Sequence, residues 1–551
     1  MLVSATPGLR AQTVPSGPAE DRILPPQRPE DTRRPSFRIE RPAPQEAAST
    51  ALVNVTAFRI EGATVVDRAQ IDAAVAPFLG QQVPIQNVFR AADAVTSLYA
   101  DAGYALSFAL VPVQDVADGT VTLRIVEGTV DKVDVQLRNV SAHVRDASLK
   151  AFVATRFRPL INAGPVRAEA LEFAALSVRE MGGTDVSVVV KPSEDTEGAA
   201  SLLVIVDVDG FDASLTTDNR LREEFGDYRV TARAAVNSLV VPGDRLSLLV
   251  SGTPDSKGIQ SGQLRYQAMI PSTATTLHAT GFTARTRGQN GLLGLLEFRG
   301  RETSVRAGFE HPLTLTRAFS LRAGTELTGS STRSSIFGVD LIAEDVRTLS
   351  YWLAGDVAPA SGGAVNWRAL VDLGLTGLGA SPALNPTRSR TTGQPDFAAV
   401  IVEGGIESPP LPGGFKLRAD IEGQLGLGGG ALASRECSFG GDRFGRAFDP
   451  GAFGGEHCVK VAMEVSRPVA IGKLALAPFA FVDTGKAWQV GPLDVLETRT
   501  SKTTSFGFGS RIALSQYLVG QVEVSWPGNG GRFAPNGSDN PRIFFTLGAR
   551  L

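Results

Sequence analysis

The C-terminal part of the chain, from Phe211 to Leu551, is a series of segments in which apolar and polar residues alternate. Between 228 and 236, Tyr, Val and Ala residues alternate with Arg229, Thr231 and Arg233. A period of two predicts β-strands with one apolar and one polar face. Strands of about ten residues with this pattern are typical of transmembrane β-barrels, whose outer face contacts lipid. A large soluble β-sandwich or solenoid would also alternate, and it remains the alternative at this point.

The length of this region predicts the number of strands. The 341 residues, at about 20 to 21 residues for each strand and its connection, give about sixteen strands, an even number as in bacterial barrels. We expect strands to end at four prolines, Pro271, Pro312, Pro468 and Pro527. We expect exposed loops in two Gly/Ser/Thr-rich segments, 329–335 and 379–394. The last strand, 541–551, would close the sheet, because an open edge in lipid leaves backbone groups unpaired.

The N-terminal part has a different organisation. Residues 1–51 are rich in Pro and charged residues and are predicted to form an arm or linker. Residues 52–129 and 130–209 each predict the order strand, helix, helix, strand, strand. Two units with the same order indicate tandem small α+β domains. Each sheet has few strands, so we expect open edges that could accept a further strand.

Composition excludes several classes of function. The net charge is -3, whereas a nucleic-acid-binding protein normally has a basic excess. No run of 18 apolar residues is present, which argues against a transmembrane helix. We find no nucleophile–base pair, no phosphate-binding loop and no set of metal ligands. The sequence therefore predicts a protein that is not an enzyme and that has no cofactor, catalytic residue or metal site.

The segment from Cys437 to Cys458 is the most unusual part of the predicted barrel. It reads CSFGGDRFGRAFDPGAFGGEHC, and the chain's two cysteines bracket it. It is too rich in glycine to form a regular strand or helix, and too rich in aromatic residues for a solvated linker. We therefore expect 437–458 to be a shaped loop that packs into another part of the protein; the family resemblance described below implies that it folds into the barrel. A Cys437–Cys458 disulfide would close its base and stabilise the fold by about 3 kcal/mol; two unpaired buried thiols are the alternative.

Three motifs resemble those of a known family. VTLRIVEG at 121–128 resembles the final strand of the first polypeptide-transport-associated (POTRA) domain. GRAF at 445–448 resembles the loop motif, and FVDTG at 481–485 the inner-strand motif, of outer-membrane transporters of two-partner (type V) secretion, the hemolysin secretion/activation type. The resemblance covers about 52–551 and implies two β-α-α-β-β POTRA domains followed by a 16-stranded barrel at 210–551.

The resemblance also implies a contact inside the barrel. Arg446 should meet Asp483 in the lumen, with Gly445, Phe448, Phe481 and Gly485 nearby. Ala447 stands where the family usually has glycine. Physical chemistry favours the same pairing, because a buried arginine needs a carboxylate, which its guanidinium can bind bidentately.

The function implied is a translocation pore in the bacterial outer membrane, with its POTRA domains in the periplasm. They would bind a large unfolded exoprotein by strand addition, near Leu106, Phe108 and Leu110, and the barrel would secrete it without ATP. We also expect contacts with outer-membrane lipid, biogenesis through the barrel-assembly machinery and periplasmic chaperones, no nucleic-acid partner and a monomeric state. The alternatives are an outer-membrane protein assembly factor of the same superfamily and a solute porin with periplasmic domains.

Overall fold

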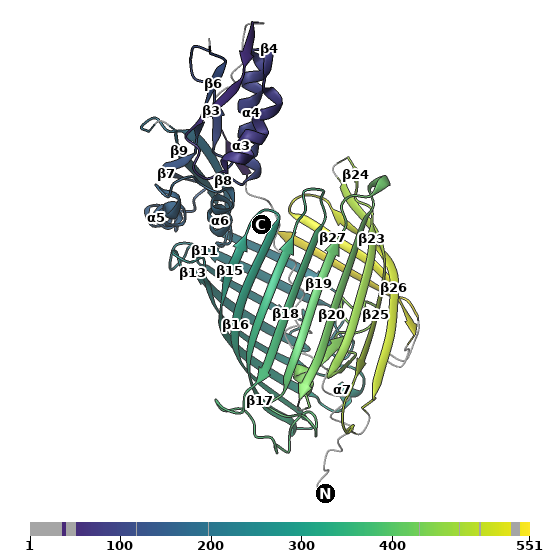
Figure 1. Ribbon diagram of the computed structural model, residues 1–551. Helices are drawn as coiled ribbons and strands as arrows, with labels where there is room; N and C mark the ends of the chain where they lie inside the picture. The colour runs from purple at the N-terminus through teal and green to yellow at the C-terminus, as the bar shows by residue number, and fades with distance from the viewer. Residues whose placement is uncertain are drawn as a thin grey trace.

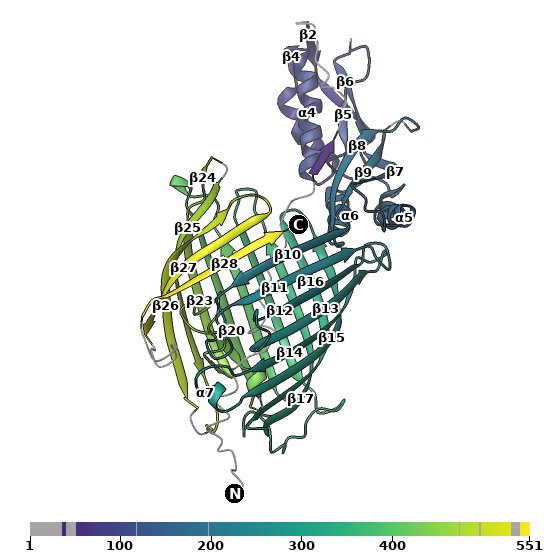
Figure 2. The same ribbon diagram turned by 180° about the vertical axis from the view of Figure 1, so that it is seen from behind.

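The protein consists of two small α+β units at one end of a closed β-barrel (Figures 1 and 2). The computed structural model describes residues 36–39, 51–116, 118–196, 198–428, 430–472, 474–494, 497–529 and 540–550. Most of the predicted arm at 1–51 lies outside these residues. Among the described helices, none has the length and apolar character needed to cross a membrane.

The first unit has a three-stranded sheet in the order β3-β6-β5, two helices and an additional two-stranded sheet, β2-β4. Its elements are β2 (Leu52–Val55), β3 (Ala57–Glu61), α3 (Arg68–Val75), η1 (Ala76–Phe78), β4 (Gly80–Pro84), α4 (Gln86–Asp101), β5 (Phe108–Leu110) and β6 (Thr120–Val126). Asp67 caps α3 by accepting a hydrogen bond from the Ala69 N–H. The apolar stripe of α4, including Val88, Val95 and Tyr99, packs onto the sheet.

The strand predicted at 106–113 is shorter than the sequence indicates, since only Phe108–Leu110 form β5. Pro112 has no N–H for the ladder. Beyond it, the Gln114 side chain takes the place of a strand: its Nε2 donates to Thr122 O (2.8 Å), and its Oε1 accepts from Thr122 N (2.6 Å). A side chain that mimics a backbone partner leaves no periodic signal in the sequence.

Glu127 fastens the end of β6 to the α3 entry and to α4. Its carboxylate accepts hydrogen bonds from the N–H groups of Thr64 (2.6 Å) and Val65 (3.0 Å) and from the Tyr99 hydroxyl (2.9 Å). Desolvation alone would raise the pKa of Glu127, but the hydrogen bonds from Thr64, Val65 and Tyr99 outweigh it and hold the pKa below its ordinary value. The ionised form therefore stabilises the first unit.

Replacement of Glu127 by glutamine is expected to destabilise the first unit by about 1 kcal/mol. A depressed folded-state pKa gives stability that is present above the unfolded value of about 4.3 and is lost as the pH falls through the folded value. Hydrogen exchange of residues 52–116 in the full chain, at pH 7 and at pH 3.5, measures both effects. An equal loss of protection on acidification, after correction for the slower intrinsic exchange at pH 3.5, in Glu127→Gln and in the wild type would contradict the role of this carboxyl.

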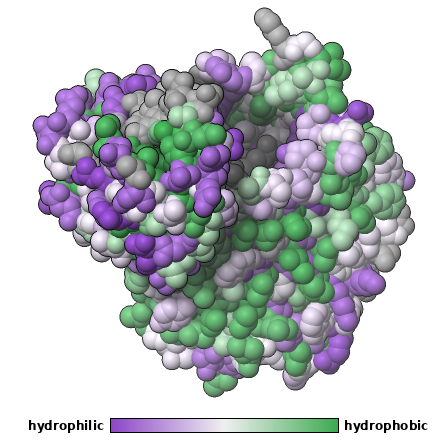
Figure 3. Space-filling view, turned by 45° about the horizontal axis from the view of Figure 1, so that its top comes forward, coloured by the Kyte–Doolittle hydropathy of each residue, from purple (hydrophilic) through white to green (hydrophobic). Residues whose placement is uncertain are grey.

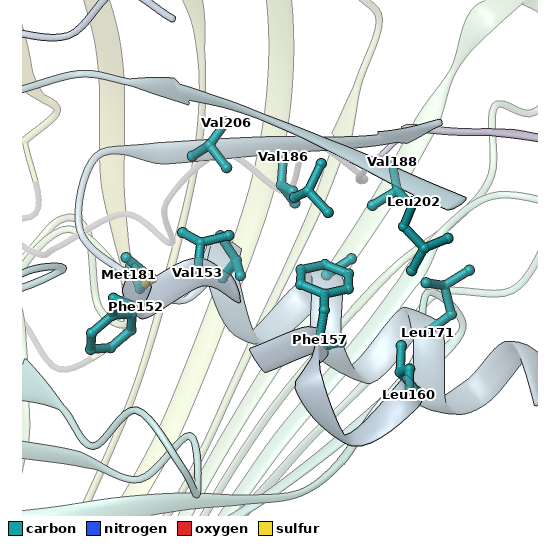
Figure 4. Close-up of a cluster of buried hydrophobic side chains, with 14 of the residues drawn as sticks. Phe152, Val153, Phe157, Leu160, Leu171, Met181, Val186, Val188, Leu202 and Val206 are labelled. Carbon is teal, nitrogen blue, oxygen red and sulfur yellow. The ribbon is translucent and has the colours of Figure 1, made fainter. Parts of the chain in front are cut away.

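The second unit repeats the connectivity of the first. Its elements are β7 (Thr129–Arg138), α5 (Asp146–Phe157), η2 (Arg158–Leu160), α6 (Ala168–Arg179), β8 (Thr184–Pro192) and β9 (Ala199–Val208). β7 pairs with β9 in parallel and β8 with β9 antiparallel, as β3 and β5 pair with β6 in the first unit. Figure 4 shows its core, in which Phe157 and Leu171 of the helices face Val188 and Leu202 of the sheet.

A strand from the N-terminal arm extends the sheet of the second unit. β1 (Ser36–Ile39) pairs in parallel with β8, from Ser36 opposite Ser187 to Ile39 opposite Val190, and gives the order β1-β8-β9-β7. The equivalent edge strand of the first unit, β5, has only β6 as a strand neighbour among the described residues. The sequence indicates open edges, and the structure shows one of them covered by the chain itself.

The second unit is docked on the turns of the barrel end that it faces. Arg156 of α5 is buried and donates from Nη2 to Ile270 O (3.0 Å) in the β13–β14 turn. Desolvation lowers the pKa of Arg156 to about 10. Glu172 and Glu180 form ion pairs with Arg317 (2.7 Å) and Arg322 (2.9 Å) near the β15–β16 turn. Met269 joins the core of the unit, so the two parts share one apolar contact.

The barrel closes through sixteen antiparallel strands, as predicted, each paired with the next and β28 with β10. β23 and β24 both pair with β25 and count as one strand, interrupted at Arg467-Pro468. The strands are β10 (Phe211–Asp218), β11 (Arg229–Asn237), β12 (Arg245–Gly252), β13 (Ile259–Met269), β14 (Thr276–Arg287), β15 (Arg299–Leu315), β16 (Phe319–Ile336), β17 (Val339–Val357), β18 (Ala364–Gly374), β19 (Ala398–Glu407), β20 (Lys416–Gly428), β23 (His457–Ser466), β24 (Val469–Ile471), β25 (Leu474–Trp488), β26 (Thr500–Ala513), β27 (Leu518–Asn529) and β28 (Arg542–Arg550). Shorter elements lie in the connections: α7 (Gly291–Leu295), η3 (Pro412–Gly414), η4 (Ala433–Arg435), β21 (Cys437–Phe439) and β22 (Phe453–Gly455).

The outer wall of the barrel is apolar, as the alternation predicts. Figure 3 shows hydrophobic residues over much of the visible wall. Exposed examples from thirteen of the strands are Leu215, Leu248, Leu264, Val305, Phe309, Leu327, Leu353, Val402, Ile421, Met463, Val482, Phe506, Val522, Ile543 and Leu547. Their polar neighbours, such as Arg229, Asp420 and Glu523, point inward and are buried. A continuous apolar surface of this extent requires lipid rather than water around it.

Some strand ends differ from the sequence expectation. Pro271 follows β13 and Pro468 separates β23 from β24, but Pro312 and Pro527 lie inside β15 and β27, where the strand pairing shifts register. The segment 329–335, expected to be a loop, belongs to β16. Its Ser and Thr residues lie in a polar part of the strand that is paired on both sides, and their composition alone does not distinguish such a strand from a loop. The segment 379–394 does lie in a connection, between β18 and β19.

Candidate functional site: the loop inside the barrel

The loop between β20 and β23 begins with a small hairpin. β21 and β22 pair with Cys437 opposite Gly455 and Phe439 opposite Phe453. These three-residue strands were not expected in so glycine-rich a segment. They form the two stems of the loop 437–458, and the residues between them form its tip. Lys460 of β23 ties one stem to the wall, donating from Nζ to Ser438 O (2.9 Å) and pairing with Glu422 (2.5 Å).

A disulfide joins Cys437 in the first stem to Cys458 at the start of β23. Both cysteines are buried, and Cys458 pairs with Gln424 of β20 and Ala487 of β25. The bond therefore fastens the loop base directly to the barrel wall. No other cysteine is present in the chain.

Removal of the disulfide is expected to destabilise the folded barrel by about 3 kcal/mol, because the unfolded chain then gains the entropy of an open loop. The test compares the wild type with the Cys437→Ser/Cys458→Ser variant by the temperature at which the barrel loses its compact gel mobility. Non-reducing gels of the wild type should show a mobility shift on reduction. Labelling of two free thiols in the unreduced protein would contradict the bond.

The loop tip lies among charged side chains that project into the lumen. Arg446 Nη1 donates to Glu464 Oε2 of β23 (3.0 Å), and the same nitrogen is 3.9 Å from Glu523 Oε2 of β27. The guanidinium also lies over the Phe481 ring, 4.1 Å from its centroid. The side chain of Arg446 is only 9% exposed. A cation so far from solvent needs these carboxylates to offset its desolvation.

Asp483 of β25 meets Arg446, but not in the bidentate geometry expected from the sequence. Its Oδ2 accepts from the backbone N–H of Arg446 (3.0 Å) and from the Ser505 hydroxyl (2.8 Å). The Arg446 Nε and the Asp483 Oδ1 are 3.6 Å apart, and neither has a hydrogen-bond partner. Asp483 thus accepts a hydrogen bond from the backbone of the tip, while Glu464 accepts one from the Arg446 guanidinium.

Further arginines balance the charge around the tip. Arg511 binds Glu464 through two hydrogen bonds (2.6 and 2.8 Å), and Arg220 donates to Glu523 (2.8 Å). With Arg446, three arginines face the three carboxylates Asp483, Glu464 and Glu523. We call these six residues the inner ion cluster. Arg542 of β28 adds contacts outside it, donating to Ala447 O (3.2 Å) and to Asp449 (2.7 Å).

Two glycines of the motifs surround one aromatic ring. The Phe439 side chain lies so close to Gly445 and Gly485 that a Cβ atom built on either would be 2.3 Å from it. Gly445 also has φ +76°, a conformation that glycine adopts without strain. Phe439 stacks on Phe453 and lies near Phe448, which is 1% exposed. The motif glycines therefore make room for Phe439, a residue that the sequence analysis did not single out.

The structure places the remaining predicted residues as follows. Phe448 and Phe481 lie at the tip and beneath Arg446, respectively. Ala447 is fully buried at negative φ, so alanine is accommodated in the position where glycine was expected. Phe108 and Leu110 lie half-buried on β5, but Leu106 packs against the core of the second unit and does not share their surface. Glu464, Glu523, Arg220 and Arg511 were missed, because single charges on alternating strands carry no motif.

A closed barrel with an apolar wall, a charged loop fastened inside it and small α+β units at one end defines a class: the POTRA-plus-barrel transporters of the bacterial outer membrane. The comparisons agree. The family model of the haemolysin secretion/activation protein ShlB/FhaC/HecB matches residues 204–507, and the model of the ShlB-type POTRA domain matches residues 53–128. The chain belongs to the haemolysin secretion/activation family, the transporters of two-partner secretion.

Curated relatives match part of the chain. The heme/hemopexin transporter protein HuxB of Haemophilus influenzae strain 86-028NP is 23% identical over 245 residues, and that of strain ATCC 51907 is 24% identical over 245 residues. Each match covers 44% of this chain and 42% of the relative. The chain is thus aligned with less than half the length of these relatives.

Solved structures share the fold. CdiB from Escherichia coli has a TM-score of 0.71 at 15% identity, with 99% of this chain and 95% of that chain covered. CdiB from Acinetobacter baumannii has a TM-score of 0.62 at 14% identity, with 98% and 96% covered. BamA from Haemophilus ducreyi lacking POTRA domains 1–3 has a TM-score of 0.51 at 12% identity, with 90% and 100% covered. At these identities the likeness concerns the fold.

Proposed function

We propose that the protein secretes an unfolded partner exoprotein through its barrel. The observation that carries this proposal is the loop tip in the lumen, which is held by ion pairs and hydrogen bonds around Arg446. Such contacts are polar and reversible, and water that enters with a passing chain can replace them. A loop of this kind closes a lumen at rest and yields to a polypeptide.

We infer that the two small units lie in the periplasm and the opposite barrel end outside the cell. The short turns meet the small units, whereas the longer connections, such as 375–397 and the one from which the loop 437–458 enters the lumen, start at the other end, as in outer-membrane barrels. The apolar wall then contacts outer-membrane lipid. We expect the barrel to insert as a monomer through the barrel-assembly machinery, with periplasmic chaperones. Since the periplasm has no ATP, folding of the exoprotein outside would drive the export.

We infer further that the second unit is also a POTRA domain. It shares the order β-α-α-β-β and the strand pairings of the unit that matches the POTRA model. Strand addition to a sheet edge would then be the means of binding the partner. β8 already carries β1, so β5, with Phe108 and Leu110, is the edge better placed to receive the exoprotein.

An assembly factor for other outer-membrane proteins is the second candidate, because the BamA structure shares the fold. Deletion of the gene in its host separates the two. The secretion pore predicts that one large exoprotein disappears from the cell surface and medium while other barrel proteins keep their abundance. A general loss of barrel proteins from the outer membrane, with exoproteins otherwise unchanged, would favour the assembly factor and contradict our proposal.

A further inference from the structure

A second ion cluster lies at the base of the loop, apart from the tip. Its centre is Arg390, in the connection between β18 and β19, whose side chain is 3% exposed. Its Nη1 donates to Glu456 Oε1 (2.7 Å) and its Nε to Glu497 Oε1 (2.7 Å), and the Nε is 3.3 Å from Glu436 Oε1. All three glutamates are at most 10% exposed. We call these four residues the outer ion cluster.

The three glutamates of the outer ion cluster come from the two stems of the loop and from a neighbouring connection. Glu436 directly precedes Cys437, and Glu456 directly follows Gly455, so one residue lies at the base of each stem. Glu497 belongs to the connection between β25 and β26. Arg390 therefore joins both stems of the loop 437–458 to two neighbouring connections, all at the barrel end away from the small units (Figure 1).

Further hydrogen bonds connect the members of the outer ion cluster through Ala431 and Gln489. Arg390 Nη1 also donates to Ala431 O (2.8 Å), and the Ala431 N–H donates to Glu456 (3.2 Å). Gln489 donates to Glu436 (2.6 Å) and accepts from the Glu456 N–H (3.1 Å). Loss of the guanidinium would leave three buried carboxylates close together, and their repulsion would separate the connections.

We propose that the outer ion cluster is a second closure of the pore, which holds the stems of the loop while the inner ion cluster holds its tip. This inference rests on the proposed secretion function. Both closures must open for the loop to clear the lumen, because release of the tip leaves in place the stems, the connection 375–397 and the described residues 489–494 and 497–499. Arg390 is thus a positioning residue of the gate, and its partner is the loop of the same chain.

Conductance of the purified full-length protein in planar lipid bilayers tests the second closure without the exoprotein. We expect Arg390→Met to increase the fraction of time in conducting states about tenfold. Arg390→Lys keeps the charge but cannot reach three carboxylates at once, so its value should lie between Arg390→Met and the wild type. If the closures act in series, the Arg390→Met/Arg446→Met variant should show roughly the product of the two single effects.

The matched control is Arg333→Met. Arg333 pairs with Asp345 (2.7 Å) on β16 and β17, is 44% exposed and makes no ion pair with the loop 437–458. Compact mobility before heating and an intact disulfide show that each variant has folded. Wild-type conductance in folded Arg390→Met, or an equal increase in Arg333→Met, would overturn the inference. If Arg390→Met conducts more but deletion of the gene leaves every exoprotein at the cell surface and in the medium, the second closure stands and the proposed secretion function fails.

Discussion

Replacement of Arg446 by alanine is expected to lower export of the exoprotein at least about tenfold while the barrel still inserts into the membrane. The change removes the cation from the centre of the inner ion cluster. Glu464 keeps Arg511 and Glu523 keeps Arg220, but Asp483 keeps only the Ser505 hydroxyl and a backbone N–H. A buried carboxylate that loses its partner costs about 3–5 kcal/mol. The tip should therefore leave its position while the outer ion cluster still holds the stems, so the displaced loop remains in the lumen and obstructs the exoprotein.

The measurement compares secreted and cell-associated exoprotein in cells that produce equal amounts of inserted barrel. Arg443→Ala is the control, because Arg443 lies in the same loop but is 40% exposed and 3.9 Å from its nearest carboxylate, Asp420. Export by Arg446→Ala at the wild-type level would exclude a transport role for the inner ion cluster and reduce Arg446 to a structural contact.

Replacement of Gly485 by alanine is expected to displace the loop from the wall as strongly as the loss of Arg446. The new methyl group would lie 2.3 Å from the Phe439 ring, far inside van der Waals contact, and the ring cannot move toward Gly445, which is equally close. Loss of the packing around a buried Phe costs about 3–5 kcal/mol. Limited proteolysis of the loop 437–458 in the inserted barrel measures the displacement.

Two further variants make this result specific. Gly281→Ala, on β14, introduces the same methyl group where no other atom lies within 4 Å, and it should leave the loop protected. Phe439→Ala/Gly485→Ala should restore part of the protection that Gly485→Ala loses, since the clash is gone. Equal cleavage in Gly281→Ala and Gly485→Ala would show that a methyl group on any barrel strand disturbs the loop, and would remove Phe439 from the explanation.

The parts of the fold that repeat could be predicted from the sequence. Alternation over more than 300 residues and an even spacing led to the sixteen strands, and the duplicated order of elements led to the two small units. The meeting of Arg446 and Asp483 followed from two motifs and from the cost of burying a lone charge. The first two inferences rest on patterns that many residues share. The third rests on the free-energy cost of burying a charge without a partner.

The parts that depend on a single long-range contact could not be predicted. Glu464 and Glu436 look like any other charged residue next to a strand, and only the closed barrel brings them to Arg446 and Arg390. Phe439 is one aromatic residue among several in the loop until Gly485 is placed beside it. β1 joins β8 over a separation of about 150 residues, with four residues and no distinctive composition.

The disulfide sets a limit on how far the loop can travel. Because Cys437 is bonded to Cys458 at the wall, the segment between them is a closed ring anchored on β23. Folded double, a ring of 22 residues extends about 35 Å at most, however completely both ion clusters open. Under the proposed function, a loop that clears the lumen therefore stays within this radius of the outer end of β23 and remains beside the path of the emerging polypeptide.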